Sequence, residues 1–201
     1  MHFRTLAFAC LALLPASLSA QEMTRDPMQV PAGTYTLDPA HGKITWGVNH
    51  LGFSTYYGQI TGVQATLVLD PQDLSRTRLS ATVDPTKVVS NDAELDAHLR
   101  NKDFFNVSAF PTVSFTATEV KRTGEHEAEI TGQLTLLGVT KPFAFRAVFN
   151  QAGLHPVDKT YTVGFTGRGV LVRSQYGMTA FLPGLGDEVS LELEGEFKAA
   201  R

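Results

Sequence analysis

Apolar and polar residues alternate along most of the chain with a period of two. In the last such segment, Val189, Leu191 and Leu193 have one parity, while glutamates occupy the other. This alternation is typical of a β-strand with one buried and one solvated face. Similar segments recur between residues 35 and 197, separated by Gly, Pro, Asn and Asp residues that favour turns. The pattern predicts an all-β protein of about eight to ten strands.

The other predicted strands each have an apolar face of the same kind. Closing eight strands gives an interior that side chains just fill or that holds one small ligand, and the pattern leaves both outcomes open. The predicted faces are Ile44, Trp46 and Val48; Val63, Ala65, Leu67 and Leu69; Leu79, Ala81 and Val83; Val113, Phe115 and Ala117; Ala128, Ile130, Leu134 and Leu136; Phe143, Phe145, Ala147 and Phe149; and Tyr161, Val163 and Phe165.

One segment, residues 91–101, interrupts the alternation and predicts a short helix. Asn91 can cap its start, and Glu94 follows three residues later, as in a capping box. Leu95 and Leu99 are four residues apart and therefore share a face. Several phenylalanines come directly after it. The helix either plugs one end of a barrel or forms a lid over a cavity.

The length of 201 residues is suited to one domain. Residues 1–20 resemble a secretory signal peptide, with Arg4, an apolar run over residues 6–14 and small residues before a cleavage site near Ala20. Residues 21–33, which have no apolar period, are expected to form a flexible leader, and residues 34–198 the folded domain. This organisation predicts a periplasmic or secreted protein.

Composition and charge exclude several classes of function. The only cysteine, Cys10, lies inside the predicted signal, so the mature chain has no thiol for redox or nucleophilic chemistry. The net charge of -3 gives no reason to expect binding to nucleic acid or to anionic membranes. No apolar run reaches the roughly 20 residues of a spanning helix, and we expect no stable membrane insertion.

Signals for catalysis and for metal binding are weak. The histidines of the mature chain show no HxH, HxxxH or HExxH spacing, so we expect no metal site. Residues 52–54 lack the second glycine of a GxSxG nucleophile elbow. Residues 167–169, Gly-Arg-Gly, match no phosphate-binding fingerprint, and glycine within a strand more often marks a bend. We therefore expect a protein without a catalytic residue or a cofactor.

Four stretches, in order along the chain, resemble the YceI-like family of exported polyisoprenoid-binding proteins with a lipocalin-like barrel. They are residues 35–58, which contain YTLDPAH and NHLGFS; residues 96–115, which contain DAHLR, DFFNV and FPTVSF; residues 132–142, GQLTLLGVTKP; and residues 163–178, which begin VGF and end RSQYGM. Leu95, Leu137 and Gln175 depart from the pattern, since many members have a charged or polar residue there. If one of these positions lies near the mouth of the barrel, the departure argues against an anionic or pyrophosphate head group.

The resemblance implies an antiparallel eight-stranded barrel that holds a long isoprenoid chain, with a homodimer as a common state. His50, His98 and Arg100 are candidates for a polar rim near the head of the ligand, or they have only structural roles. The apolar residues expected to line the lumen are Trp46, Val48, Phe53, Leu67, Leu69, Leu79, Val113, Phe115, Ile130, Leu134, Phe143, Phe145 and Phe165.

Three other functions remain open at this stage. An eight-stranded outer-membrane barrel would show the same alternation with the apolar face directed outward. A lipid-modifying enzyme could use His50 or His98 as an acid or a base in the same cavity. A filled barrel would serve as an interaction module and contain no ligand.

Overall fold

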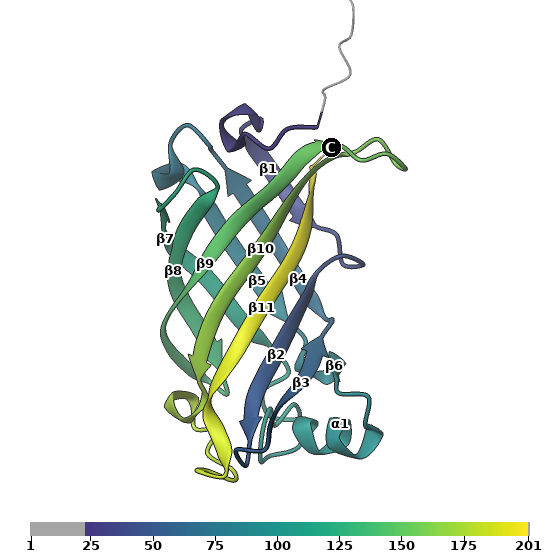
Figure 1. The fold of residues 1–201 in the computed structure, drawn as a ribbon, viewed down its shortest axis with the longest axis vertical. Coiled ribbons are helices and arrows are strands. Elements are labelled where there is room, and N and C mark those ends of the chain that lie inside the picture. The colour runs from purple at the N-terminus through teal and green to yellow at the C-terminus, as the bar shows by residue number, and fades with distance from the viewer. Residues whose placement is uncertain (1–22, 201) are drawn as a thin grey trace, which may run out of the picture.

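The protein folds into one antiparallel sheet that closes into a barrel (Figure 1). The computed structural model describes residues 23–200. Eight strands form the barrel, and it closes because β1 pairs with both β4 and β11. They are β1 (Gly33–Leu37), β4 (Val63–Leu69), β5 (Arg78–Val83), β7 (Val113–Arg122), β8 (Glu127–Leu136), β9 (Val139–Leu154), β10 (Tyr161–Val172) and β11 (Leu185–Ala199). The predicted eight-stranded antiparallel barrel with one short helix is confirmed.

Three further strands extend the sheet from β11, and they are β2 (Lys43–His50), β3 (Ser54–Ile60) and β6 (Val88–Val89). β11 pairs with β2 over residues 185–194 and with β1 over residues 197–199. Gly195 lies between the two pairings. A Cβ atom there would lie 2.9 Å from the Phe197 ring and 3.0 Å from the Leu37 side chain. The absence of a side chain lets β11 change partner without opening the wall.

The inward side chains form two apolar clusters, one toward the β1 end of the barrel and one toward the α1 end. The alternation of inward and outward side chains shifts at two bulges. One lies in β7 between Ala117 and Glu119, and the other interrupts the pairing of β9 with β10 next to Gly164. Beyond the first bulge, Val120 therefore faces the interior although its parity differs from that of Phe115. Each bulge adds one residue to a strand and changes which parity faces inward.

The predicted helix is present as α1 (Ala93–Arg100), at the end of the barrel farthest from the C-terminus (Figure 1). The predicted cap is wrong. Asp92, not Asn91, accepts hydrogen bonds from the main-chain N–H groups of Glu94 and Leu95. Asn91 has a φ of 65° and forms the turn before the helix. Both residues have cap-forming side chains, so the sequence alone could not separate them.

The segment before β1 differs from the expected loose leader. Thr24 and Ala152 exchange main-chain hydrogen bonds of 2.7 and 2.8 Å, and Val30 is buried in the cluster at the β1 end. The predicted signal peptide, its cleavage near Ala20 and Cys10 lie outside the described residues. Within residues 23–200, no helix is both long and apolar enough to cross a membrane. The short 3-10 helices are η1 (Pro27–Gln29), η2 (Leu74–Arg76), η3 (Pro85–Lys87) and η4 (Arg173–Tyr176).

Arg173 fastens the chain at the α1 end. Its side chain is 2% exposed and donates to three main-chain carbonyls, those of Gly186 (2.8 Å), Met178 (2.8 Å) and Leu185 (2.9 Å). Burial lowers the pKa of the guanidinium, and the nearby Asp187 carboxylate opposes that change. The guanidinium remains charged because its usual pKa lies far above neutrality. It holds η4 and the loop after it against the start of β11.

Replacement of Arg173 by methionine should destabilise the fold. Three carbonyl oxygens would lose a charged donor in a buried site, and we expect the free energy of unfolding to fall by about 3 kcal/mol or more. Urea denaturation followed by circular dichroism measures this change. The matched control is Arg168→Met, because Arg168 has a side chain 63% exposed and pairs only at the surface with Glu192. Equal midpoints for both variants would contradict the assigned role of Arg173.

Candidate functional site

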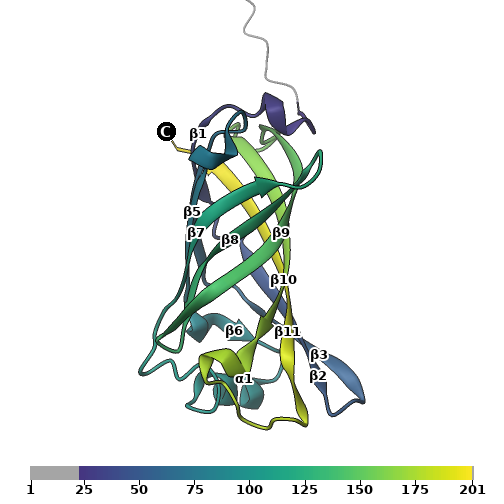
Figure 2. The same ribbon diagram turned by 90° about the vertical axis from the view of Figure 1, so that its left-hand side faces the viewer.

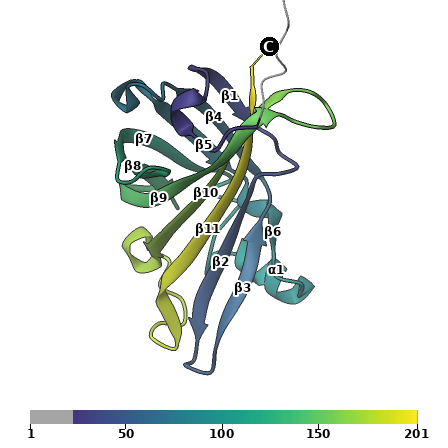
Figure 3. The ribbon, with the colours of Figure 1, turned by 45° about the horizontal axis from the view of Figure 1, so that its top comes forward.

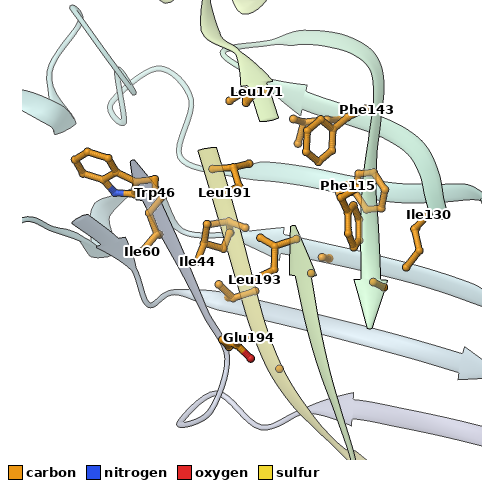
Figure 4. Close-up of a pocket in the computed structure, with 18 of the residues that line it drawn as sticks. Ile44, Trp46, Ile60, Phe115, Ile130, Phe143, Leu171, Leu191, Leu193 and Glu194 are labelled. Atoms are coloured by element: carbon orange, nitrogen blue, oxygen red, sulfur yellow. The ribbon is translucent and has the colours of Figure 1, made fainter. Parts of the chain in front are cut away.

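A cavity of about 650 Å³ occupies the interior of the barrel. This volume lies within the range of about 300 to 1,000 Å³ that is usual for small-molecule sites. Its wall is almost entirely apolar and is built from the inward residues of the strands (Figure 4). The prediction that the apolar parity faces inward therefore holds, which is the reverse of an outer-membrane barrel. On the outer surface, Arg168 and Glu192 form an ion pair.

Phenylalanine rings form two groups on the cavity wall. The ring of Phe115 lies 6.2 Å from Phe143 and 5.6 Å from Phe145, and the last two rings are stacked 6.1 Å apart. Toward the β1 end, Phe165 contacts Phe149 and Phe197 at 5.8 and 6.1 Å. Such rings offer wide apolar surfaces with little conformational freedom to lose on binding.

The glycines of residues 167–169 make room for these rings. A Cβ atom on Gly167 would lie 3.0 Å from Leu193 and 3.2 Å from Phe145. A Cβ atom on Gly169 would lie 3.0 Å from the Phe143 ring. Both glycines lie inside β10, as expected of glycine in a strand and not of a phosphate-binding loop.

At the α1 end, the cavity is covered by α1 and by two aromatic residues. His98 Nε2 lies 3.0 Å from the Asp103 carboxylate, and its ring lies edge-on to Phe104 at 5.1 Å and to Phe181 at 5.7 Å. The Phe104 and Phe181 rings stack at 6.0 Å. Leu95 of α1 also lines the cavity. The helix therefore contributes to the cavity wall at this end, in keeping with either a plug or a lid.

At the β1 end, the lining becomes polar and the segment before β1 crosses the opening. Pro27 and Val30 line the cavity beside Arg122, whose guanidinium donates to the carbonyl of Pro71 at 3.3 Å. Glu125 also lines it and has a side chain 87% exposed. Polar groups thus line the cavity at both ends, with Arg122 and Glu125 at the β1 end and His50, His98 and Arg173 at the α1 end.

Most of the residues predicted to line the lumen do so. Phe53 does not, and this prediction is wrong. β2 ends at His50, the chain turns through Leu51 and Gly52, both with positive φ, and Phe53 lies at the tip of the turn, 89% exposed. The predicted residues found on the cavity wall are Trp46, Val48, Leu67, Leu69, Leu79, Val113, Phe115, Ile130, Leu134, Phe143, Phe145 and Phe165.

Of the three candidates for a polar rim, His50 and His98 line the cavity at the α1 end. Arg100 does not line it, and its guanidinium donates to the carbonyl of Thr86 at 3.3 Å. The alternation missed Phe181, because it lies in a loop without a strand period. Its only signal in the sequence is a large aromatic residue among turn-forming neighbours.

The polar groups at the cavity form no recognisable catalytic arrangement. Among the hydrogen bonds of the described residues, none joins His98 or His50 to a serine or threonine hydroxyl. In the same part of the chain, no group of three or more His, Cys, Asp and Glu residues is placed to hold a metal ion. The buried indole N–H of Trp46 has no partner among residues 23–200.

Comparison with known proteins gives a consistent result. The sequence model of the YceI-like domain matches residues 35–197. A UPF0312 protein of Shewanella oneidensis is 36% identical over 184 residues, which cover 90% of this chain and 93% of the relative. The crystal structure of BcnA from Burkholderia cenocepacia superimposes with a TM-score of 0.72 at 19% identity, covering 82% of this chain and 99% of that one.

A second solved structure of the same fold is described as a polyisoprenoid binding domain from Saccharophagus degradans. It superimposes with a TM-score of 0.62 at 11% identity, covering 83% of this chain and 98% of that domain. At this level of identity, the likeness to both solved structures shows the barrel fold alone.

The cover at the α1 end is held by Asp96, and its removal should loosen α1. Asp96 Oδ1 accepts from the main-chain N–H (2.7 Å) and the hydroxyl (2.6 Å) of buried Ser90. In Asp96→Ala, we expect the free energy of local opening to fall by about 1.5 to 3 kcal/mol, so that the amides of α1 exchange faster with solvent. Hydrogen exchange measures this change. Exposed Glu94, on the same helix, supplies the control Glu94→Ala; equal exchange in both variants would refute the role of Asp96.

Proposed function

The chain belongs to the YceI-like family, and we propose that it binds a long-chain apolar lipid inside its barrel. The ligand class we propose is a polyisoprenoid or an isoprenoid quinone. The observation that carries this proposal is the cavity of about 650 Å³ with a wall of apolar side chains. The polyisoprenoid binding attributed to the related Saccharophagus domain supports the choice of lipid.

Burial of hydrocarbon is sufficient to drive such binding. Transfer from water releases about 0.8 kcal/mol per CH₂ group. A prenyl chain of some tens of carbons thus exceeds in gross energy the ceiling of about 18 to 21 kcal/mol for non-covalent affinity. Ordering of the chain and loss of its free motion offset much of this energy. The length and width of the cavity, rather than a charged anchor, would select the ligand.

At the α1 end of the cavity, a neutral head group fits the polar residues better than a pyrophosphate does. The guanidinium of Arg173 lines the cavity, but its three donor nitrogens are all engaged by main-chain carbonyls. Arg100 lies off the cavity. His50, His98 and the indole N–H of Trp46 are polar groups suited to a carbonyl or hydroxyl, such as that of a quinone or prenyl alcohol.

We propose a carrier or binding protein, not an enzyme, that acts in the periplasm or after secretion. The His98–Asp103 pair is the strongest feature in favour of catalysis, because a carboxylate can orient an imidazole for proton transfer. Its ring instead packs edge-on against the stacked rings of Phe104 and Phe181, which suits a structural role in the cover. Turnover of a bound lipid that disappears in His98→Ala would favour the enzyme.

A charge in the lumen should abolish lipid binding. Phe145 lines the cavity, and a buried glutamate in its place would lack a partner and displace hydrocarbon. Protein purified from its native compartment should contain a stoichiometric prenyl lipid by mass spectrometry of an organic extract, and Phe145→Glu should contain less than about a tenth of it.

The control for this experiment introduces the same charge on the other face of the same strand. Ala144 precedes Phe145 in β9 and is exposed, so Ala144→Glu should retain the lipid. Circular dichroism confirms that each variant folds. A folded Phe145→Glu protein with the lipid content of the wild type would exclude the lumen as the binding site. A wild-type protein that contains no lipid and takes up none would refute the proposed function.

A further inference from the structure

Three large apolar side chains lie exposed together at the α1 end of the barrel. They are Leu51 and Phe53, in the turn between β2 and β3, and Phe181, in the loop before β11, with exposed fractions of 58%, 89% and 60%. We call them the apolar tip. The two segments are joined, because the main-chain N–H of Leu51 donates to the carbonyl of Gly184 at 2.9 Å. Exposed apolar groups that gather in this way often mark an interaction site.

The exposure is built into the fold and is not the result of loose packing. Leu51 and Phe181 have φ angles of 56° and 61°, a region that non-glycine residues seldom adopt. The turn is braced by the bonds of Gly52 N–H to Asn49 Oδ1 (2.9 Å) and of Phe53 N–H to the His50 carbonyl (3.0 Å). Backbone strain of this kind collects at functional sites.

The apolar tip is continuous with the wall of the cavity. Leu51 and Phe181 line the cavity although more than half of each side chain is exposed. One face of the Phe181 side chain stacks on buried Phe104, which also lines the cavity. Apolar side chains therefore continue from the cavity wall through Phe104 to the partly exposed Phe181 and Leu51, and Phe53 lies two residues after Leu51 in the same turn.

The opposite end of the barrel has a different surface. There, the segment before β1 crosses the cavity, and charged Arg122 and Glu125 line it. The β2–β3 turn projects beyond the barrel on the side away from the C-terminus (Figure 2). In the tilted view it is the lowest part of the ribbon, opposite the C-terminus (Figure 3). The apolar tip can thus contact a surface while the end that carries Arg122 and Glu125 remains in water.

We propose that the apolar tip docks on the surface of a lipid bilayer, so that the ligand passes between bilayer and cavity without crossing water. This inference rests on the proposed function. Attachment to a membrane interface strengthens with the apolar area inserted and can be reversible, whereas a stable protein dimer buries about 800 Å² on each partner. The net charge of -3 gives no attraction to anionic lipid. The proposed attachment is therefore by insertion of apolar side chains.

The test measures binding of the intact protein to phosphatidylcholine vesicles by flotation. Phe53→Ser changes only the outermost side chain, which does not line the cavity. Its membrane partition should fall about tenfold, and transfer of a prenyl lipid from vesicles should slow by a similar factor. Binding of the wild type should persist at high salt, because attachment is apolar.

The matched control is Val157→Ser, which removes an apolar side chain that is 83% exposed in the loop between β9 and β10. This variant should bind vesicles and take up lipid as the wild type does. Docking through the apolar tip would be overturned if Phe53→Ser bound vesicles as strongly as the wild type. It would also be overturned if Phe53→Ser and Val157→Ser lost vesicle binding equally.

Two further outcomes separate this inference from the proposed function. Lipid offered in ethanol bypasses the bilayer, and Phe53→Ser should bind it as well as the wild type does. If the wild type binds lipid from ethanol but never floats with vesicles, docking is refuted and the proposed function stands. A dimer in solution that Phe53→Ser dissociates, with no vesicle binding, would also refute docking and assign the tip to a second copy of this chain.

Discussion

The main-chain hydrogen bonds of β11 determine the shape of the whole molecule. This strand pairs with β10 along one edge and with β2 and then β1 along the other, so it both closes the barrel and attaches the extra strands that lengthen it. Closure gives every barrel strand two partners and forces all inward side chains into one enclosed space. The arrangement depends on Gly195, where the Phe197 and Leu37 side chains occupy the space that a side chain would need.

Enclosure alone does not make a cavity, because side chains can fill the interior of an eight-stranded barrel. Here, the aromatic side chains stand beside inward glycines, as at Phe143 and Phe145 beside Gly169 and Gly167. The Phe143 and Phe145 rings stack on each other, and both line the cavity of about 650 Å³. The phenylalanines therefore supply an apolar surface, and the glycines beside them leave space that suits the proposed lipid ligand. The two ends then differ, since the segment before β1 lies at one and the stacked rings of Phe104 and Phe181 lie at the other.

The sequence was sufficient to predict the strands of the barrel, because burial on one face of a strand leaves a period of two in the residues, and the family resemblance directed their apolar faces inward. It did not predict the additional strands β3 and β6. It could not show that the interior is hollow, since alternation reports direction and not volume. Phe53 was misplaced and Phe181 missed because both lie in turns, where no period relates sequence to direction. The helix cap fell on Asp92 rather than Asn91 because neighbouring residues had equal capping ability.

The bulge in β7 determines where this barrel tolerates a change in chain length. Ala117 pairs with Gly132 and Glu119 with Thr131, which leaves Thr118 without a partner position of its own. Loss of Thr118 would restore regular alternation and keep Val120 directed inward. Loss of one residue elsewhere in the strand would turn every later side chain to the opposite face. Single-residue gaps between homologous barrels are thus compatible with a conserved interior only at such points.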